Sequence, residues 1–568
     1  MRLLSLSCDH QPPFHGITFN REGLTLIVGD AAENEPEEGS SNGVGKTLAL
    51  GIVHHCLGAN IDARLKKAVP NWVFTLAFEL NNHQHVIERS GDSKKLTLDG
   101  QSLSLAALRN WLDSSGAFLL DPAVPGLSFR SLIKRFTRYT RQDCVDPIRT
   151  NGEQDYDGRL RSLYLLGLDV NLAVSKKKHK NDLDDIARSL KSWQEDHLLK
   201  EVFRAGAQPK VRAEWLEREI ARLKSDLSKF KVAEDYRAVE LEAGELTKQL
   251  REIEQRLAVL QFQRDGIEKA LQVQPDISKE DLLDLYDGLQ SIFQPATLAH
   301  FDAVEAFHLS LAANRRARLE SDRGRLVAEA GDLESRRQET ALKRDQKLQS
   351  LQGKRALDEY ASVARHVASL EEEHVKLIAF INFESSLKER AQRVREQRVE
   401  EDRVAGDYVA SEPVAQIDKY FSELATMLYP QLPSGIVLGH NVGDNQVRYD
   451  LTVQIEGDDS DGINAARIIC FDWTLLMRGA RHSVEFLWHD NRLFADLDPN
   501  VRALWMDHAI SSLKDTHRQY IATINTENFD AMKPHLSSEM NQVIEDAVKL
   551  VLRGDAPENK LLGIQFGK

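Results

Sequence analysis

SSNGVGKT, residues 40–47, is the stretch of this sequence where residue type and spacing together specify a chemistry. Gly43 and Gly45 allow the backbone to turn its N–H groups inward around a phosphate. Lys46 can reach the β- and γ-phosphates, and the hydroxyl of Thr47 can bind Mg²⁺. The stretch therefore predicts a loop that binds a nucleoside triphosphate, with ATP and Mg²⁺ as the expected ligands.

The segments on either side of this loop have the pattern that phosphate binding requires. The apolar run 24–28, LTLIV, predicts a strand before the loop, and residues 48–57 predict an apolar helix after it. This strand–loop–helix order places the phosphates at a helix N-terminus, where unpaired backbone amides and the helix dipole favour an anion.

The loop departs from the full pattern G-x-x-x-x-G-K-[ST] at its first position, which is Ser40. Gly39 lies one residue early, and Gly29 precedes an acidic, polar insertion at 30–38. We interpret the region as a strand that ends at Gly29, a solvated inserted loop, and then the phosphate cradle. The alternative is a glycine-rich surface turn that happens to precede a lysine, and the flanking strand and helix favour the nucleotide site.

Composition limits the class of protein. With 568 residues the chain is long enough for two to four domains, and its 29% charged and 7% aromatic residues favour long solvated helices. The net charge of −14 argues against a protein that coats nucleic acid, although a local basic patch is compatible with it. Cys8, Cys56, Cys144 and Cys470 form no C-x-x-C pair, so neither a disulfide framework nor a zinc site is expected. With no leader-like N-terminus and no 18-residue apolar run, we expect a soluble, cytoplasmic protein.

Residues 1–172 are predicted to be α/β and to form the N-terminal half of a domain. A basic segment with interleaved aromatic residues lies within it, around residues 129–149. Such a segment can follow a nucleic-acid backbone, and its candidate DNA contacts are Lys134, Arg135, Arg138 and Arg141. It can equally be a solvated helix face or a set of phosphate contacts to the nucleotide.

Residues 173–412 change character and are predicted to form a long antiparallel coiled-coil hairpin, with its apex near 273–305. Leu216, Ile220, Leu223, Leu227 and Phe230 are spaced 4-3-4-3, and further heptad seams follow on both sides of Pro275 and Pro295. An unbroken helix over the proline-free stretch after Pro209 would span on the order of 95 Å. The alternative is a compact helical bundle, because the heptad register breaks near 232–241 and 342–357.

Residues 413–568 return to α/β character, with predicted strands at 447–455, 483–488 and 520–524. They are therefore predicted to be the second half of the domain that begins before residue 170. The apolar strand 484–489 ends in Asp490, which is placed to hold a Mg²⁺ that bridges the phosphates. The turn at 461–467 opens a helix whose N-terminus could bind a γ-phosphate, and Gln142 is available to sense metal or water.

This arrangement resembles the ATP-binding-cassette heads of the SMC and RecF/RecN group, in which two halves of one α/β head are separated by a coiled-coil hairpin. The resemblance implies that Asn42–Thr47 is the Walker A loop, Gln142 the Q-loop, Asp461–Arg467 a degenerate signature loop and Asp490 the Walker B aspartate. It places Asp498 in the D-loop and Asn525 in the switch region. The implied nucleotide contacts are Ser41, Asn42, Gly43, Val44, Gly45, Lys46, Thr47, Leu48, Arg64, Gly462, Asn464, Asp498 and Asn525. The implied metal contacts are Thr47, Gln142 and Asp490, and the implied catalytic residues are Lys46, Asp490, Asn491 and Gln142.

More narrowly, the GVGKT…HHCLG opening and the FLWHDN…LDPN ending resemble the SMC-like subunit of three-component antiphage systems of the Lamassu type. That resemblance implies a homodimer through the heads, double-stranded DNA or DNA ends as a ligand, a nuclease effector and a small accessory subunit. No zinc hook or membrane is expected. The alternatives are a structural tether with a kleisin-like partner and a repair ATPase that processes DNA ends.

One residue departs from the active heads of this group. The glutamate that orients or deprotonates the attacking water directly follows the Walker B aspartate, and here that position is Asn491. An amide cannot accept the proton of water, and neither Asp496 nor Asp498 has the usual spacing to replace the glutamate. Because general-base help contributes roughly 10²–10⁴-fold, slow hydrolysis is expected.

Overall fold

The computed structural model describes residues 1–10, 13–30, 44–194, 208–228, 234–272, 296–349 and 355–566. The chain divides into two compact units. The head comprises Met1–Lys178, Gln294–Val304 and Val399–Lys568, and the arm comprises His179–Phe293 and Glu305–Arg398. Within the described ranges, no helix is long and apolar enough to cross a membrane.

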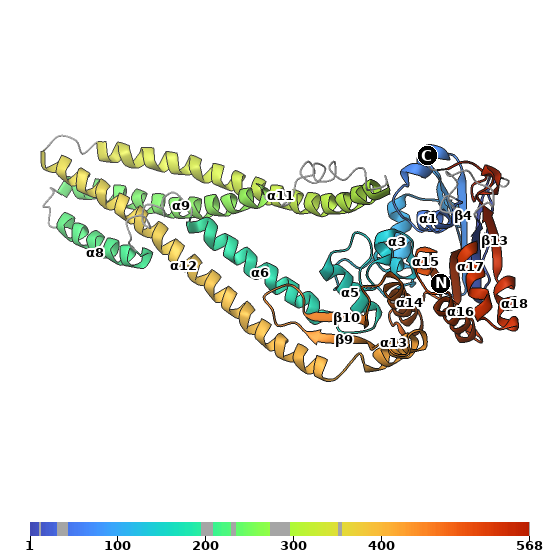
Figure 1. Cartoon of the computed structure of the whole chain (residues 1–568). Helices are drawn as coiled ribbons and strands as arrows, with labels where there is room; N and C mark the ends of the chain where they lie inside the picture. Colours follow the sequence, from blue (N-terminus) through green and yellow to red (C-terminus); the bar gives the residue numbers. More distant parts are fainter. Residues whose placement is uncertain are drawn as a thin grey trace. The chain divides into compact units, whose positions relative to one another are not determined.

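A five-stranded parallel sheet forms the centre of the head, and both ends of the chain contribute to it. Its order is β13-β3-β12-β11-β8. In β3 and β12, Val28 pairs with Ile524 and Gly29 with Asn525. Figure 1 shows this mixture as blue and red elements in the same unit. Strands from both ends of the chain therefore belong to one α/β unit. The strands are β3 (Gly23–Asp30), β8 (Thr137–Arg138), β11 (Phe486–His489), β12 (Gln519–Asn525) and β13 (Val548–Arg553).

A second, antiparallel sheet has the order β2-β1-β4-β5-β6-β7. Asn81 and Asn82 join β4 to β5 with φ angles of 53° and 62°, a left-handed turn that asparagine tolerates and that matches the twist of a hairpin. The strands are β1 (Arg2–Cys8), β2 (Ile17–Thr18), β4 (Val73–Leu80), β5 (His83–Ser90), β6 (Leu96–Leu98) and β7 (Gln101–Ser102).

Helix α1 (Lys46–Cys56) contacts strands of both sheets, namely β3 and β12 of the parallel sheet and β4 and β5 of the antiparallel one. Its side chains Leu50, Ile52 and Val53 are fully buried in the core of the head. The phosphate loop is therefore followed by a helix that both sheets hold in place.

Short helices complete the N-terminal part of the head. They are α2 (Ala63–Ala68), α3 (Leu105–Ser114), α4 (Phe129–Leu132), η2 (Ile133–Phe136), η3 (Arg141–Cys144) and α5 (Asp155–Leu165).

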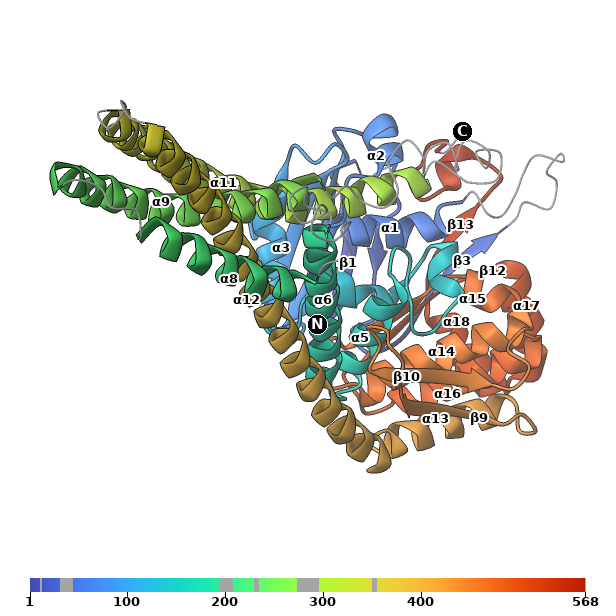
Figure 2. The ribbon, with the colours of Figure 1, turned by 90° about the vertical axis from the view of Figure 1, so that its left-hand side faces the viewer.

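The C-terminal part of the head adds the helices that pack on the parallel sheet and a two-stranded hairpin, β9 (Ser434–His440) and β10 (Tyr449–Ile455). Figure 2 shows this hairpin beside α13 and α14, which it also contacts. The helices are α13 (Ala415–Leu428), α14 (Asp461–Arg478), α15 (Arg492–Ala495), α16 (Pro499–Leu513), α17 (Thr526–Met532), η4 (Lys533–His535), α18 (Ser538–Asp546) and η5 (Pro557–Asn559).

The arm consists of long helices, which Figure 1 shows in green to orange. Its apolar core combines Ala213, Leu216 and Ile220 of α8 with Val367, Leu370 and Leu377 of α12. The helices are α8 (Pro209–Ser228), α9 (Glu234–Gln272), most of α11 (Ala296–Gln349), and the parts of α6 (Asn171–Gln194) and α12 (Arg355–Ala410) that lie outside the head.

Contacts along α9 give the directions of its neighbours. Arg256 pairs with Glu329 at 2.6 Å and Lys347 pairs with Glu242, so α9 and α11 run antiparallel, as a hairpin predicts. The contacts Tyr360–Glu240, Arg251–Glu371 and Phe262–Phe383 keep a constant offset along the chain, so α9 runs parallel to α12. Helix α9 therefore has two partners of opposite direction.

The expectation of one unbroken helix of about 95 Å after Pro209 is wrong. Lys224 of α8 and Arg251 of α9 both pair with Glu371, whereas one straight helix would hold these two residues about 40 Å apart. Helices α11 and α12 do not continue each other either, because α9 runs antiparallel to α11 and parallel to α12. The multiple partners match the bundle alternative in this part of the arm. Most of the predicted apex, 273–295, lies outside the described residues.

Candidate functional site

A cavity of about 520 Å³ lies where the parallel sheet, α1 and the C-terminal segment meet. The end of the predicted phosphate loop lines it from Val44 to Leu48, with Gly51 one turn further along α1. Gly45 has a φ of 106°, a left-handed conformation that favours glycine, and it is the N-cap of α1. The helix N-terminus therefore opens onto the cavity. Ser41, Asn42 and Gly43 lie outside the described residues.

Lys46 lies across the end of β3. A Cβ added to Gly29 would be 2.0 Å from the Lys46 Nζ, so the glycine at this position leaves the space that the ammonium group occupies. The side chain is largely buried, and burial lowers its pKa to about 8 although Asp490 opposes the shift. A buried cation beside a helix N-terminus is well suited to bind the anionic phosphates of a nucleotide.

Asp490, one residue past β11, lies opposite the loop. Its Oδ1 accepts hydrogen bonds from the hydroxyl of Thr47 at 3.0 Å and from the hydroxyl of Thr523 at 2.9 Å. Burial raises the pKa of the Asp490 carboxyl, and the two hydroxyl groups only partly offset this effect. The sequence prediction that Lys46, Thr47 and Asp490 belong to one site agrees with this geometry.

This pair of oxygen ligands fits Mg²⁺. The ion prefers carboxylate and hydroxyl oxygens together with phosphate oxygens and water, and Thr47 and Asp490 present such oxygens to the same cavity. When bound, Mg²⁺ would neutralise phosphate charge beside the buried carboxylate.

Asn491 also lines the cavity, and its orientation is set by its partners. The backbone N–H of Asn525 donates to Asn491 Oδ1 at 2.7 Å, and Asn528 Nδ2 lies 3.4 Å from the same oxygen. The oxygen is therefore the atom held by β12 and α17, and the NH₂ group is the remaining polar group of the side chain. An amide NH₂ is a donor and cannot accept a proton from water.

Two arginine residues contribute further positive charge to the wall. Arg64, the predicted site arginine, lines the cavity, but its guanidinium is paired with Asp62 through contacts of 2.8 and 3.1 Å. Arg492 lines it as well, with Nε 3.5 Å from Asp490 Oδ2. Arg492 was missed by the sequence reasoning, although it follows Asn491 directly.

The remaining predicted nucleotide contacts are not part of this lining. Gln142 is exposed in η3. Gly462 packs against the backbone of Asp496, and Asn464 donates to the carbonyl of Val145 at 3.1 Å. Asp498 caps α16, and Asn525 reaches the site only through its backbone contact with Asn491. Within one chain, then, the predicted signature, D-loop and switch residues do not complete the cavity that Lys46 and Asp490 form.

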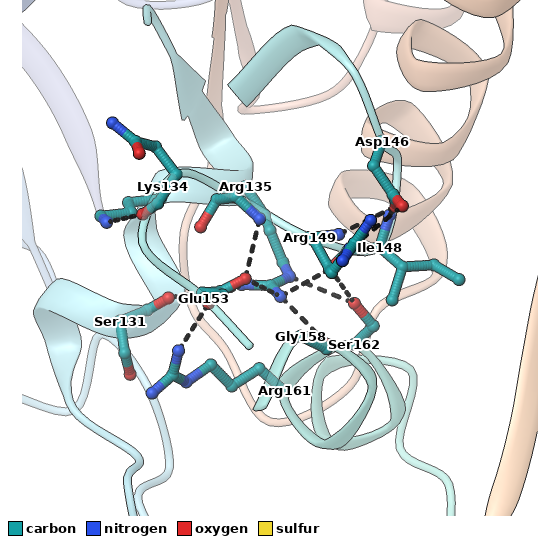
Figure 3. A network of polar contacts seen from close by, with 12 residues as sticks. Ser131, Lys134, Arg135, Asp146, Ile148, Arg149, Glu153, Gly158, Arg161 and Ser162 are labelled. Carbon is teal, nitrogen blue, oxygen red and sulfur yellow. Dashed lines mark hydrogen bonds and ion pairs between the residues drawn. The ribbon is translucent and has the colours of Figure 1, made fainter. Parts of the chain in front are cut away.

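The prediction that Arg135 contacts DNA is wrong, because its guanidinium is buried, and the ammonium group of Lys134 is bound within the protein. The Arg135 guanidinium is fully buried and binds Glu153 at 2.9 and 3.1 Å, together with the carbonyl oxygens of Ile148 and Gly158 (Figure 3). Burial raises the pKa of Glu153, but Arg135 and Arg161 outweigh it and hold the value at about 2. Lys134 donates to the carbonyl of Asn151 at 2.8 Å, and burial lowers its pKa. Both cations stabilise the loop at 146–158; Arg135 is buried, whereas Lys134 stays half-buried.

The prediction that Arg138 contacts DNA is wrong for the same reason. It is fully buried, and its guanidinium forms a bidentate ion pair with the carboxylate of Asp472 in α14, with N–O distances of 2.5 and 2.8 Å. Its remaining donors bind the carbonyl oxygens of Asp143, Asp146 and Pro147. Of the four predicted DNA contacts, Arg141 is the exposed one. Arg135 and Arg138 of the basic, aromatic segment are therefore internal. The composition of the segment did not indicate the carbonyl and carboxylate groups that these cations bind.

The sequence reasoning also missed two parts of the wall. Tyr139 lines the cavity, with its ring 4.6 Å from that of His54. The C-terminal segment Lys560–Phe566 contributes Lys560, Leu561, Leu562, Ile564 and Phe566. Tyr139 stood out only as an aromatic residue in a basic segment, and nothing in the local sequence LLGIQF marks a ligand site.

A comparison with protein families matches the C-terminal part of the chain. Residues 425–566 match a family described as "Uncharacterised protein conserved in bacteria (DUF2326)", so the match includes Asp490 and the C-terminal segment. No curated protein matches the chain.

Solved structures of Smc heads are similar over most of the chain. A Smc head domain with a coiled coil and joint from Pyrococcus yayanosii is 13% identical, with 94% of each chain covered and a TM-score of 0.32. A Smc head with an extended coiled coil bound to the C-terminal domain of ScpA, from Pyrococcus furiosus, is 13% identical, with 94% and 92% covered and a TM-score of 0.33. A SmcHead bound to the C-winged helix domain of ScpA is 9% identical, with the same coverage and TM-score.

Proposed function

We propose that this chain is an SMC-like ATP switch, in which ATP and Mg²⁺ bind between Lys46, Thr47 and Asp490. The observation that carries the proposal is the bond between Thr47 and Asp490, which are 443 positions apart in the sequence yet line one cavity with Lys46. A buried lysine, a hydroxyl and a carboxylate at a helix N-terminus form the arrangement that binds a metal-bound triphosphate.

The switch is proposed to close by dimerisation of two heads. The N-terminus of α14 is exposed and does not line the cavity of its own chain, although the resemblance assigns it to the nucleotide. A second copy can supply that helix to the open side of the triphosphate. In this proposal each ATP is held by the phosphate loop of one chain and by α14 of the other.

Hydrolysis is proposed to be slow, so that the closed state lasts. The position of a general base is occupied by Asn491, whose oxygen binds the Asn525 backbone and whose NH₂ group is a donor. Bound ATP would then mainly stabilise the dimer of two heads, which suits a latch or sensor better than a motor.

The proposed input is DNA, and the proposed output is control of a partner effector, a nuclease in antiphage or anti-plasmid defence, with a small accessory subunit. These assignments are supported by the resemblance of the GVGKT and FLWHDN motifs to Lamassu-type subunits. Because Arg135 and Arg138 are buried, DNA contact is proposed to use other groups, with Arg141 and the half-buried Lys134 as the remaining candidates of the original four. Affinity purification from the native operon, followed by nuclease assays with and without DNA, tests this part.

Mixing two inactive variants tests the switch itself. Lys46→Ala removes the phosphate cation, and Ser460→Arg places a bulky side chain at the exposed start of α14, where Ser460 makes no side-chain cap bond. Each variant alone should remain monomeric with ATP and Mg²⁺ in light scattering. Their mixture should dimerise, because one of the two composite sites is then intact.

The control for this experiment is Lys67→Ala, an exposed lysine of α2, which should dimerise like the unmodified chain. Dimerisation of Lys46→Ala alone would contradict the assignment of the phosphate site. A mixture that stays monomeric, while the unmodified chain dimerises, would contradict the sharing of each site between two heads.

A further inference from the structure

The C-terminal segment Lys560–Phe566, here named the strap, is fixed across the phosphate loop. The backbone N–H of Leu561 donates to the carbonyl of Val44 at 3.0 Å, and its own carbonyl accepts from the His15 N–H at 2.9 Å. Leu561 and Leu562 are 0% and 1% exposed and belong to the core of the head. The strap is therefore a built wall of the cavity.

The strap and the phosphate loop fit each other closely. A Cβ added to Gly45 would lie 2.6 Å from the Cβ of Leu561, a separation that real Cβ atoms do not adopt. Any side chain at position 45 would have to displace the strap. The glycine is thus required by the strap as well as by its left-handed backbone.

Apart from Lys560, whose Nζ donates to Gln565 Oε1 at 2.7 Å, the wall that the strap supplies is apolar, unlike the phosphate end of the cavity. Ile564 and Phe566 line the cavity and are only half-buried. Leu562, which is buried, also lines it. The phosphate end is lined by the charged and polar side chains of Lys46, Thr47 and Asp490. A nucleotide has the same two ends, a charged triphosphate and a flat base whose face packs on apolar and aromatic side chains.

We infer that the strap is the base-binding wall of the nucleotide site, with Ile564 and Phe566 packing against the face of a purine. This inference rests on the proposed function, because it needs the triphosphate to lie on Lys46. Packing on the face of a base is sequence-tolerant, since every base has one. The strap therefore contributes affinity, and ATP and GTP should bind to within a few-fold of each other.

Calorimetric titration with two probes separates the two ends of the site. Mg·ATP reports on base and phosphates, and Mg·tripolyphosphate reports on phosphates alone. Phe566→Ala should weaken Mg·ATP by about 5- to 150-fold, the range for loss of one base–aromatic stack, and leave Mg·tripolyphosphate unchanged. Phe566→Trp keeps a stacking surface, so its affinity for Mg·ATP should be close to that of the unmodified chain. The fluorescence of the tryptophan introduced in Phe566→Trp should respond to Mg·ATP and not to Mg·tripolyphosphate.

The matched control is Val543→Ala in α18, an apolar side chain 41% exposed that does not line the cavity. It should leave both titrations unchanged. Equal loss of both probes in Phe566→Ala would overturn the inference, because the strap would then act through the phosphate loop. Unchanged binding of Mg·ATP would overturn it as well. Failure of the unmodified chain to bind either probe would instead refute the proposed function.

Discussion

The hydroxyl of Thr47 donates a hydrogen bond to Asp490 Oδ1 at 3.0 Å, and this contact joins the first helix of the head to the end of β11. Thr523 donates to the same oxygen from β12. Three segments from distant parts of the chain therefore converge on one buried carboxylate. In the proposed nucleotide-bound state, these oxygens would be available to a divalent cation.

Replacing Asp490 with Asn should remove the dependence of ATP binding on Mg²⁺. The amide keeps the shape and one acceptor oxygen but not the negative charge that favours a hard cation. A lost contact between charged groups corresponds to about 1.5–3 kcal/mol, so Mg²⁺-dependent affinity should fall roughly 10- to 100-fold. ATP titrations with Mg²⁺ and with EDTA measure this effect. Asp496→Asn, an exposed neighbour, is the control, and a retained Mg²⁺ effect in Asp490→Asn would place the metal elsewhere.

ATP binding should weaken as the pH rises through about 8. Burial lowers the pKa of Lys46 to about 8, so above that pH the free protein carries a neutral amine. Binding then requires uptake of a proton, and the affinity should fall by up to about tenfold per pH unit until the higher pKa of the complex is reached. Phosphates, with a second pKa near 6, are already ionised in this range.

Lys46→Arg separates this effect from a general loss of stability at high pH. A guanidinium stays protonated throughout the range, so any residual binding in that variant should not change between pH 7.5 and 9.5. A flat profile in the unmodified chain would mean that the lysine is already charged at pH 9, contrary to its burial.

Isolated protein should hydrolyse ATP slowly, and Asn491→Glu should accelerate it. A median enzyme turns over at about 10 s⁻¹, and loss of a general base costs about 10²–10⁴-fold, so turnover on the order of 0.1 to 0.001 s⁻¹ is expected. Glutamate can keep an oxygen against the Asn525 N–H and offer a second oxygen to water. Steady-state phosphate release, with and without DNA, is the measurement. Asn491→Gln, which is longer but still an amide, should show no gain, and turnover near 10 s⁻¹ in the unmodified chain would contradict the latch.

Arg138→Ala should destabilise the head by about 3–5 kcal/mol, because it leaves the carboxylate of Asp472 buried without its partner. Arg141→Ala, at an exposed position, should change stability by no more than about 0.5 kcal/mol. Urea denaturation followed by fluorescence compares the two variants. The double variant Arg138→Met/Asp472→Leu should recover part of the loss, since it removes both buried charges. A fully stable Arg138→Ala protein with weakened DNA binding would restore the original DNA assignment.

Local patterns in the sequence were sufficient for several strands, among them β3, β10, β11 and β12, for the helix after Gly45 and for the aspartate that follows β11. Glycine spacing and an apolar strand before Lys46 are local causes, and β3 and α1 follow from them. The alternation of 447–455 likewise predicts β10. An apolar strand that ends in an aspartate identifies Asp490, because the carboxyl ends of parallel strands meet at one edge of a sheet.

Charge patterns and heptads were not sufficient, because their meaning depends on partners that are remote in the chain. The sequence shows that Arg138 is a cation, but only its pairing with Asp472, 334 positions away, makes it an internal group. Heptad seams specify that a helix has an apolar face without naming its partner, so α9 pairs with α11 in one direction and with α12 in the other.

The sequence by itself determined a glycine-rich stretch before Lys46, an aspartate at the end of an apolar strand and α/β character at both ends of the chain, since each follows from a local pattern. Only the tertiary structure decided which charges face solvent, which atom of Asn491 is held by β12 and α17 and which segment forms the apolar wall of the cavity. The strap illustrates the physical reason. Its contacts to Val44 and His15 are backbone hydrogen bonds, and backbone groups are the same in every sequence.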